Sequence, residues 1–220
     1  MTLAVITIRG ADDAATGAAT LEIGRTPDRS PHRTGNAVAL LAGRVQAAAM
    51  DRARPDRTRV HVRQATLGDV AQIKDLAVDN AMFGAEDLAG FDEMLTSYFD
   101  GSLPGHQWIV AENSSGAVTG AAYYAPEPFA DRVWNLYFLA VRPDSHRTGI
   151  GHTLITHVEH ALRTAGDALA RVLIVETSST DPYQPARRLY AREGFTQEAV
   201  IREFYGPGDH KVTFWRQLHE

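Results

Sequence analysis

The sequence predicts an α+β fold in which helices pack on a mixed β-sheet. Apolar residues alternate in some segments, as in strands, and recur at helical spacing in others. The segments follow the order β-α-α-β-β-β-α-β-α-β-β, and no internal repeat is visible. This order departs from the strict strand-helix alternation of an all-parallel sheet, so we expect a mixed α/β arrangement.

The folded domain is expected at residues 58–220, after a weakly ordered N-terminal extension at residues 1–57. The extension is poor in aromatic residues and is interrupted by RTPDRSPHRTGN and DRARPDR. Alternatively, translation begins at Met50, just before the folded pattern. The intact mass of natively expressed protein would distinguish the two.

The first half of the domain predicts one strand, two helices and a hairpin. RVHVRQA alternates like a strand, and Thr66 with Asp69 forms a capping signature for the helix that follows it. The apolar face of that helix carries Val70, Ile73, Leu76 and Ala77. A second helix is expected from Asp87 to Asp100, with a stripe of Leu88, Phe91, Leu95 and Phe99. QWIVAE and AVTGAAYYA flank the turn NSSG and predict a hairpin.

The second half predicts buried strands that alternate with two helices. VWNLYFLAV is almost continuously apolar, which is typical of a central strand covered on both faces. The next helix runs from Ile150 to about Gly166, and RVLIVE follows as a strand. PARRLYARE predicts a helix that ends at Gly194, before the strands FTQEAVIREF and KVTFWRQL.

The composition excludes several classes of protein. With 44% hydrophobic and 22% charged residues, the chain resembles a soluble globular protein. The absence of cysteine excludes disulfides, cysteine-based zinc sites and thiol nucleophiles, and it fits a cytoplasmic location. The start lacks the features of a signal peptide, and the apolar segment 37–50 is too short to span a membrane, so no membrane partner is expected.

The charge distribution tells more than the net charge of −5, which itself argues against nucleic acid as a partner. No lysine or arginine occurs between Lys74 and Arg132, whereas carboxylates are frequent there. They are Asp75, Asp79, Glu86, Asp87, Asp92, Glu93, Asp100, Glu112, Glu127 and Asp131. This acidic segment forms either a solvated face or the mouth of a site for a cationic partner.

The turn from Ser145 to Gly151 joins a strand to a helix N-terminus, an arrangement that presents free N–H groups to phosphate. A nucleoside-triphosphate loop requires GxxxxGK[ST], but no lysine lies between Lys74 and Lys211. A dinucleotide fingerprint requires a third small residue, and Leu154 stands at that position. The phosphate therefore belongs to another class of ligand.

Two segments carry a family resemblance. LAVRPDSHRTGIGHTLI resembles the acyl-CoA-binding segment of the GNAT superfamily of N-acetyltransferases, and PARRLYAREGF is similar to its A-x-x-L-Y-x-x-x-G-F segment. They occur in the family's order, and the resemblance covers roughly residues 59–220. It implies a GNAT-like acyl-CoA N-acyltransferase fold, with a mostly antiparallel central sheet of about six to seven strands flanked by helices.

The resemblance implies acetyl-CoA as the acyl-donor cosubstrate. In the family, a [QR]-x-x-G-x-[GA] turn cradles the pyrophosphate, and the matching residues are His146, Arg147, Thr148, Gly149, Ile150 and Gly151. His152, the next residue, belongs to the expected site as well. Where two strands separate, the pantetheine arm is expected on the backbone N–H groups of Leu139, Ala140 and Val141. Tyr183 and Arg187 complete the set of residues expected to contact acetyl-CoA. Two positions depart from the family: His146 replaces Gln or Arg, and Tyr183 replaces an asparagine that many members have.

The catalytic residues implied are Tyr190 and Glu176. Tyr190 matches the family's tyrosine and would protonate the departing thiolate as the general acid. Glu176 ends a strand at the expected gap and could accept the proton of the amine, with Glu112 and Glu127 as competitors for this role. The histidines at 152, 157 and 160 fit no metal-binding motif, so no metal site is expected.

The function expected is an acetyl-CoA-dependent N-acetyltransferase whose amine acceptor attacks the thioester directly. The acceptor would be a cationic primary amine: a small amine, an amino acid, or a peptide or protein amine. YYAPEPFADR, EFYGPGDHK and the acidic helices are expected to contact it. One alternative is a non-catalytic acyl-CoA-binding sensor or docking module, and another is transfer of a longer acyl group. A homodimer is a further arrangement open to such folds, although no segment indicates an interface.

Overall fold

The structure is a computed structural model that describes residues 60–80, 82 and 87–219. Seven strands form one sheet in the order β1-β2-β3-β4-β5-β7-β6. Their bounds are β1 (His61–Gln64), β2 (Gln107–Glu112), β3 (Val118–Pro126), β4 (Val133–Val141), β5 (Val172–Ser178), β6 (Thr196–Gly206) and β7 (Asp209–Gln217). Only β4 and β5 pair in parallel; the other neighbours are antiparallel. The expected extension at 1–57 and the alternative start at Met50 lie outside the described residues.

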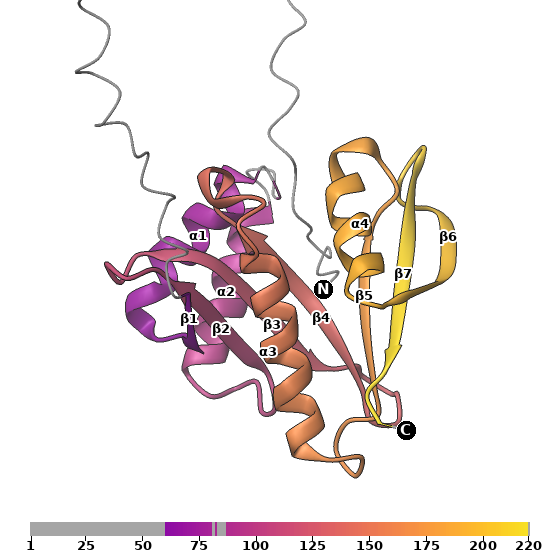
Figure 1. Cartoon of the computed structure of the whole chain (residues 1–220), viewed down its shortest axis with the longest axis horizontal. Helices are drawn as coiled ribbons and strands as arrows, with labels where there is room; N and C mark the ends of the chain where they lie inside the picture. The colour runs from indigo at the N-terminus through magenta and orange to yellow at the C-terminus, as the bar shows by residue number, and fades with distance from the viewer. Residues whose placement is uncertain (1–59, 81, 83–86, 220) are drawn as a thin grey trace, which may run out of the picture. The chain divides into compact units, whose positions relative to one another are not determined.

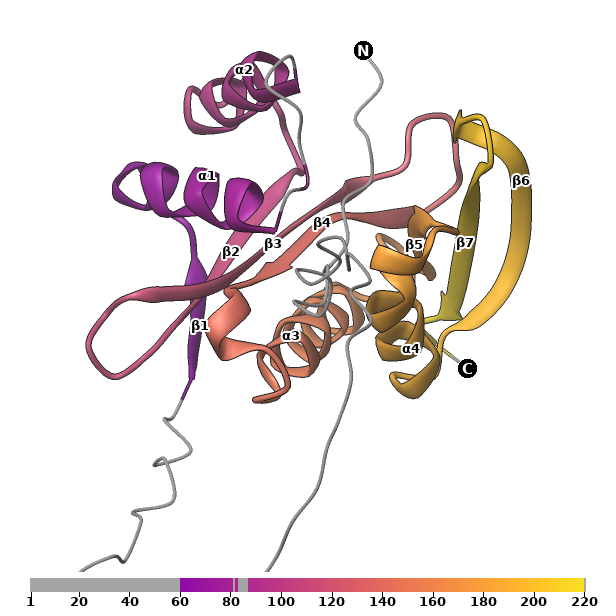
Figure 2. The ribbon, with the colours of Figure 1, turned by 90° about the horizontal axis from the view of Figure 1, so that it is seen from above.

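Two helices cover each face of the sheet (Figures 1 and 2). They are α1 (Val70–Asp79) and α2 (Asp87–Phe99) on one face, and α3 (Ile150–Ala165) and α4 (Gln184–Arg192) on the other. This confirms the predicted fold class and the predicted order of elements. The helices pack through the predicted stripes, although the side chain of Leu88 lies outside the described part of the chain. None of the helices within the described ranges is long and apolar enough to cross a lipid bilayer.

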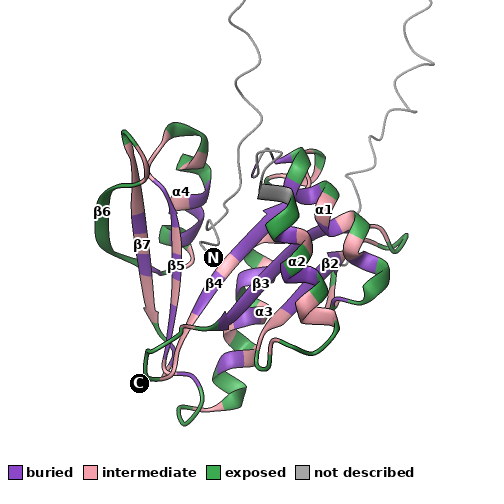
Figure 3. Cartoon of the chain, turned by 180° about the vertical axis from the view of Figure 1, so that it is seen from behind, coloured by how far each residue is buried: buried purple, intermediate pink, exposed green. Residues whose placement is uncertain are grey.

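Strand β4 is buried against both helix layers, which explains its almost continuous apolar sequence (Figure 3). It also contains a β-bulge. Tyr123 of β3 faces Phe138 and Tyr124 faces Leu136, so that Tyr137 is an extra residue on β4. A bulge bends its strand and interrupts the hydrogen-bond ladder.

The parallel pairing of β4 with β5 covers three positions, from Val133↔Val172 to Asn135↔Ile174, and ends just before the bulge. Beyond it the two strands separate towards the carboxyl end of β4 (Figure 1). We call this unpaired part of the two strands the β4–β5 gap. The bend at Tyr137 accounts for it, since β4 keeps its pairing with β3 up to Val141.

The start of α1 is fixed by a buried carboxylate. Asp69 accepts hydrogen bonds from the backbone N–H of Thr66 at 2.8 Å and from Arg63 through two nitrogens, at 2.7 and 2.9 Å. The Arg63 guanidinium is the main reason why the pKa of Asp69 falls to about 2. Residues Leu67–Asp69 form a 3₁₀ turn, and α1 itself begins directly after this turn, at Val70.

Candidate active site

Beyond Asn135, the backbone N–H groups of β4 that face β5 take no part in strand pairing. Arg142 N–H donates to Thr119 O at 2.9 Å and so extends the pairing of β4 with β3. Because N–H directions alternate along a strand, Ala140 also points towards β3, whereas Leu139 and Val141 point into the gap. The expectation of three consecutive donors is therefore wrong for Ala140.

At the open end of the gap, the turn before α3 adopts a conformation that requires glycine. Gly149 has φ +97° and caps α3, which begins at Ile150. Thr148 Oγ1 donates to Ser145 O at 2.7 Å and closes the turn. The first N–H groups of α3 lack intrahelical acceptors and lie at the positive end of the helix dipole. The turn can thus bind an anionic group, as its sequence predicts.

The side chains of the turn differ in how free they are to contact an anionic ligand. His146 Nε2 donates to Val141 O at 2.8 Å, so the imidazole holds the turn against the end of β4. A direct contact between this ring and a phosphate is thereby disfavoured. His152 Nδ1 lies 2.7 Å from Glu193 Oε2 and links α3 to the end of α4. Arg147 is exposed and forms no ion pair within the described chain, which leaves its guanidinium free for an anion.

Arg187 and Tyr183 lie at the start of α4. Arg187 Nη1 donates to Ser178 O at 2.6 Å and to Thr180 O at 2.9 Å, so the guanidinium clamps the connection from β5 to α4. Burial lowers the pKa of Arg187. These bonds give Arg187 a structural role that the sequence did not reveal. Tyr183 is half-buried at the position that precedes α4.

The two expected catalytic residues lie on opposite faces of the sheet. Tyr190 is fully buried with Phe195 and Phe214, at ring-centroid distances of 6.1 and 5.5 Å, in the core that also contains Val175 of β5. Side chains alternate along a strand, so Glu176 projects to the other face. There Glu176 Oε1 forms an ion pair of 2.9 Å with Lys211 Nζ, and both side chains are mostly buried.

Comparisons with known proteins agree with this geometry. The Acetyltransferase (GNAT) domain family matches residues 104–197. A solved structure from Desulfovibrio desulfuricans, assigned to the GNAT family of acetyltransferases, is 29% identical with a TM-score of 0.66, covering 73% of this chain and 99% of its own. The chain belongs to the GNAT superfamily. No curated protein sequence matches it.

Two further GNAT structures share the fold at lower identity. YncA from Salmonella typhimurium, solved with acetyl-CoA, is 21% identical over 74% of this chain and 96% of its own, with a TM-score of 0.57. An aminoglycoside 6′-N-acetyltransferase complexed with coenzyme A is 14% identical over 73% of this chain and 98% of its own, also with a TM-score of 0.57.

In this GNAT domain, a polar cluster occupies the bulge on the face of α1 and α2. Glu127 Oε2 accepts hydrogen bonds from Tyr137 Oη at 2.7 Å and from Asn135 Nδ2 at 3.1 Å. Burial and the Glu127 carboxylate raise the pKa of Tyr137, and Glu176 adds a smaller effect of the same sign. Sequence reasoning named Glu127 only as a competing base and missed its partners. The available signal was the presence of Asn135 and Tyr137 in an otherwise apolar strand.

Glu112, the other competing base, lies far along the sheet from the gap. It ends β2 and accepts a hydrogen bond from Arg63 Nε at 2.8 Å and one involving His61 at 3.1 Å. Strand β3 and strand β4 separate it from the gap in the strand order. The geometry therefore removes Glu112 from the candidates.

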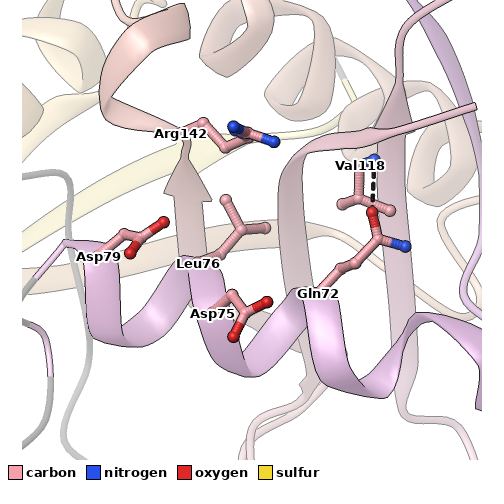
Figure 4. Close-up of a pocket in the computed structure, with 6 residues that line it drawn as sticks. All are labelled: Gln72, Asp75, Leu76, Asp79, Val118 and Arg142. Carbon is pink, nitrogen blue, oxygen red and sulfur yellow. Dashed lines mark hydrogen bonds between the residues drawn. The ribbon is translucent and has the colours of Figure 1, made fainter. Parts of the chain in front are cut away.

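The acidic segment is partly neutralised. Asp92, Glu112 and Asp131 form ion pairs with Lys74, Arg63 and Arg132. Asp75 and Asp79 form none among the described residues, and they line a pocket of about 250 Å³ between α1 and the end of β4 (Figure 4). The pocket is completed by Gln72, Leu76, Val118 and Arg142. The pocket thus combines two carboxylates with the guanidinium of Arg142, which itself pairs with Asp144 at 3.1 Å.

Proposed function

We propose that this GNAT protein transfers the acetyl group of acetyl-CoA to a primary amine. The observation that carries the proposal is the alignment of two features at one end of the sheet. The β4–β5 gap offers strand N–H groups to an amide-bearing arm, and the turn before α3 offers helix N–H groups to a phosphate. Two GNAT structures with the same fold contain CoA or acetyl-CoA.

In the proposed reaction, the amine nitrogen attacks the thioester carbonyl, the C–N bond forms and the C–S bond breaks. The N–H groups of Leu139 and Val141 would hold the arm and polarise the carbonyl. Glu176 would accept the amine proton, and Tyr190 would give its proton to the thiolate. Because Glu176 and Tyr190 lie on opposite faces of the sheet, Glu176 could remove a proton from the amine while Tyr190 donates one to the sulfur.

Lys211 affects the proposed base directly. Its ammonium group pairs with Glu176 at 2.9 Å and lies 4.0 Å from the ring centroid of Phe204. A cationic acceptor that uses Glu176 must compete with this internal cation. Glu127, which holds no cation within the described chain, is therefore the second candidate for binding the amine or taking its proton.

Calorimetric titration of the full chain with acetyl-CoA tests the donor site. We expect micromolar binding that is lost in the Gly149→Glu, Gly151→Glu variant, because both carboxylates would repel the pyrophosphate. Amine-dependent release of CoA then tests the reaction. Absence of binding in the wild-type chain would contradict the donor site itself.

A non-catalytic acyl-CoA-binding module is the second candidate. The internal bonds of His146 and Arg187 favour it, since these side chains are engaged in the fold and the donor site relies on backbone groups. Micromolar binding without CoA release for any of a panel of diamines, amino acids and peptides would select this function over catalysis.

A further inference from the structure

Lys211 is a primary amine that already lies beside the proposed base. Its Nζ atom is 2.9 Å from Glu176 Oε1, and the two side chains are only 13% and 16% exposed. Thr213 Oγ1 donates to the same carboxylate oxygen at 3.4 Å, and the ammonium group lies over the ring of Phe204. The fold thus holds an amine and a proton acceptor in direct contact.

The pairing of β5 with β7 carries Lys211 to the β4–β5 gap. Glu176 and Ser178 are two residues apart on β5, and Lys211 of β7 pairs with Ser178. Residues two apart on a strand and residues directly opposite each other project to the same face, so the three side chains share one face of the sheet. Both β5 residues lie beyond Ile174, where the pairing with β4 ends. The ion pair therefore places the amine of Lys211 over the part of β5 that belongs to the gap.

We propose that the protein acetylates Lys211 at its own active site. The reaction rests on the acetyl transfer proposed above, with Lys211 in the place of the external amine. A tethered amine beside its base needs no diffusional encounter, which makes the step effectively unimolecular. The segment EFYGPGDHK, expected from the sequence to contact the acceptor, thus contains an acceptor of its own.

The proton balance of this step uses the groups already proposed for catalysis. The Lys211 ammonium gives one proton to Glu176, and the neutral nitrogen attacks the thioester carbonyl. The C–N bond forms, the C–S bond breaks and Tyr190 protonates the thiolate, while a second proton from the nitrogen replaces the one that Tyr190 gave. The products are the CoA thiol, an uncharged acetamide and one proton, which Glu176 releases to solvent. Because Lys211 loses its charge, Glu176 becomes free for an external amine.

The chain contains one other lysine, which provides an internal reference. Lys74 lies on α1 and pairs with Asp92 at 2.7 Å. Its side chain is 37% exposed, against 13% for Lys211. Uncatalysed acetylation by acetyl-CoA in solution should therefore favour Lys74, whereas acetylation at the active site should favour Lys211.

Peptide mass spectrometry of the full chain, incubated with acetyl-CoA and no other amine, tests the proposal. We expect Lys211 to be acetylated about tenfold or more faster than Lys74, at a rate that does not depend on protein concentration. Glu176→Gln should slow the acetylation of Lys211 about tenfold or more and leave that of Lys74 unchanged. Asp92→Asn is the matched control, because it removes the carboxylate that pairs with the other lysine and should leave the acetylation of Lys211 unchanged.

Circular dichroism confirms that each variant is folded, and calorimetry on the same protein measures acetyl-CoA binding. If the chain binds acetyl-CoA but acetylates Lys211 no faster than Lys74, the proposal is overturned and the proposed function stands. If the chain binds no acetyl-CoA, both fail. A rate at Lys211 that rises in proportion to protein concentration indicates transfer between molecules and overturns the step within one chain.

Discussion

At the scale of single residues, the proposed chemistry depends on two groups in contrasting surroundings. Tyr190 is fully buried in an aromatic core, whereas Glu176 lies beside the ammonium group of Lys211 on the other face of the sheet. The proposed mechanism therefore assigns the general acid to apolar surroundings and the general base to a position beside a cation.

Replacing Tyr190 by Phe should lower the turnover number by about 10²-fold or more, because the thiolate would lose its proton donor. The affinity for acetyl-CoA, measured by calorimetry, should stay within about twofold. Tyr124→Phe is the matched control, since Tyr124 is buried in the same core and lies on β3. A normal turnover in the Tyr190 variant would make its hydroxyl structural.

Asp69 should make the stability of the fold dependent on pH in the acid range. Its pKa falls from 3.8 to about 2 on folding. The Arg63–Asp69 interaction is therefore fully present above pH 3.8 and is lost as the pH falls towards 2. The shift corresponds to about 2 kcal/mol. Urea unfolding of Asp69→Asn should show a loss of this order at pH 7 and a weaker dependence on pH between about 4 and 2 than the wild-type chain shows.

At the scale of elements, the contact between β3 and α3 sets the position of the turn that we propose as the phosphate site. A Cβ atom on Gly120 would lie 2.8 Å from Ile150 Cγ2 and 3.1 Å from Leu154 Cδ1, so only glycine allows α3 to pack this closely. Ile150 is the first residue of α3. The distance between sheet and helix at Gly120 therefore controls where the first N–H groups of α3 point.

Gly120→Ala should destabilise the protein by roughly 1–3 kcal/mol through overpacking, and it should also weaken acetyl-CoA binding.

Gly90→Ala is the control, because here an added Cβ atom meets free space. Nothing lies within 4 Å of a Cβ built on Gly90, which is in the interior of α2. That variant should be more stable by about 0.5–1 kcal/mol, with unchanged binding. Equal urea midpoints for the two variants would contradict this account of α3.

Much of the fold could be predicted from the sequence because its periodicities are local. The ends of α3 and the helix stop at Gly194 follow from nearby residues, and the structure confirms them. The partners of site residues could not be predicted in the same way. Glu176 meets Lys211 of another strand, and the bulge at Tyr137 depends on the register with β3. Such contacts arise only when distant segments pack together.

At the scale of the whole molecule, carboxylates that form no ion pair among the described residues should attract cationic acceptors. Asp75 and Asp79 line the pocket between α1 and the end of β4, and Glu127 lies at the bulge. Salt screens charges over about 10 Å at 0.1 M. Raising the ionic strength from about 0.05 to 0.5 M should therefore raise the KM of a diamine severalfold. The KM of an aromatic amine that is uncharged at pH 7 should change little; an equal rise for both would exclude electrostatic attraction.

The short β4–β5 pairing also has a mechanical meaning. Strands β1 to β4 form one hydrogen-bonded group and strands β5 to β7 form another. Only the three parallel pairs between β4 and β5 join the two groups, and they lie at one end of these strands. The apolar core under α3 and α4 contacts both groups of strands, and apolar contacts are non-directional. We therefore expect the two groups to tilt relative to each other about the three paired positions. A molecule bound between β4 and β5 would restrict this motion, most of all at the end farthest from the paired positions.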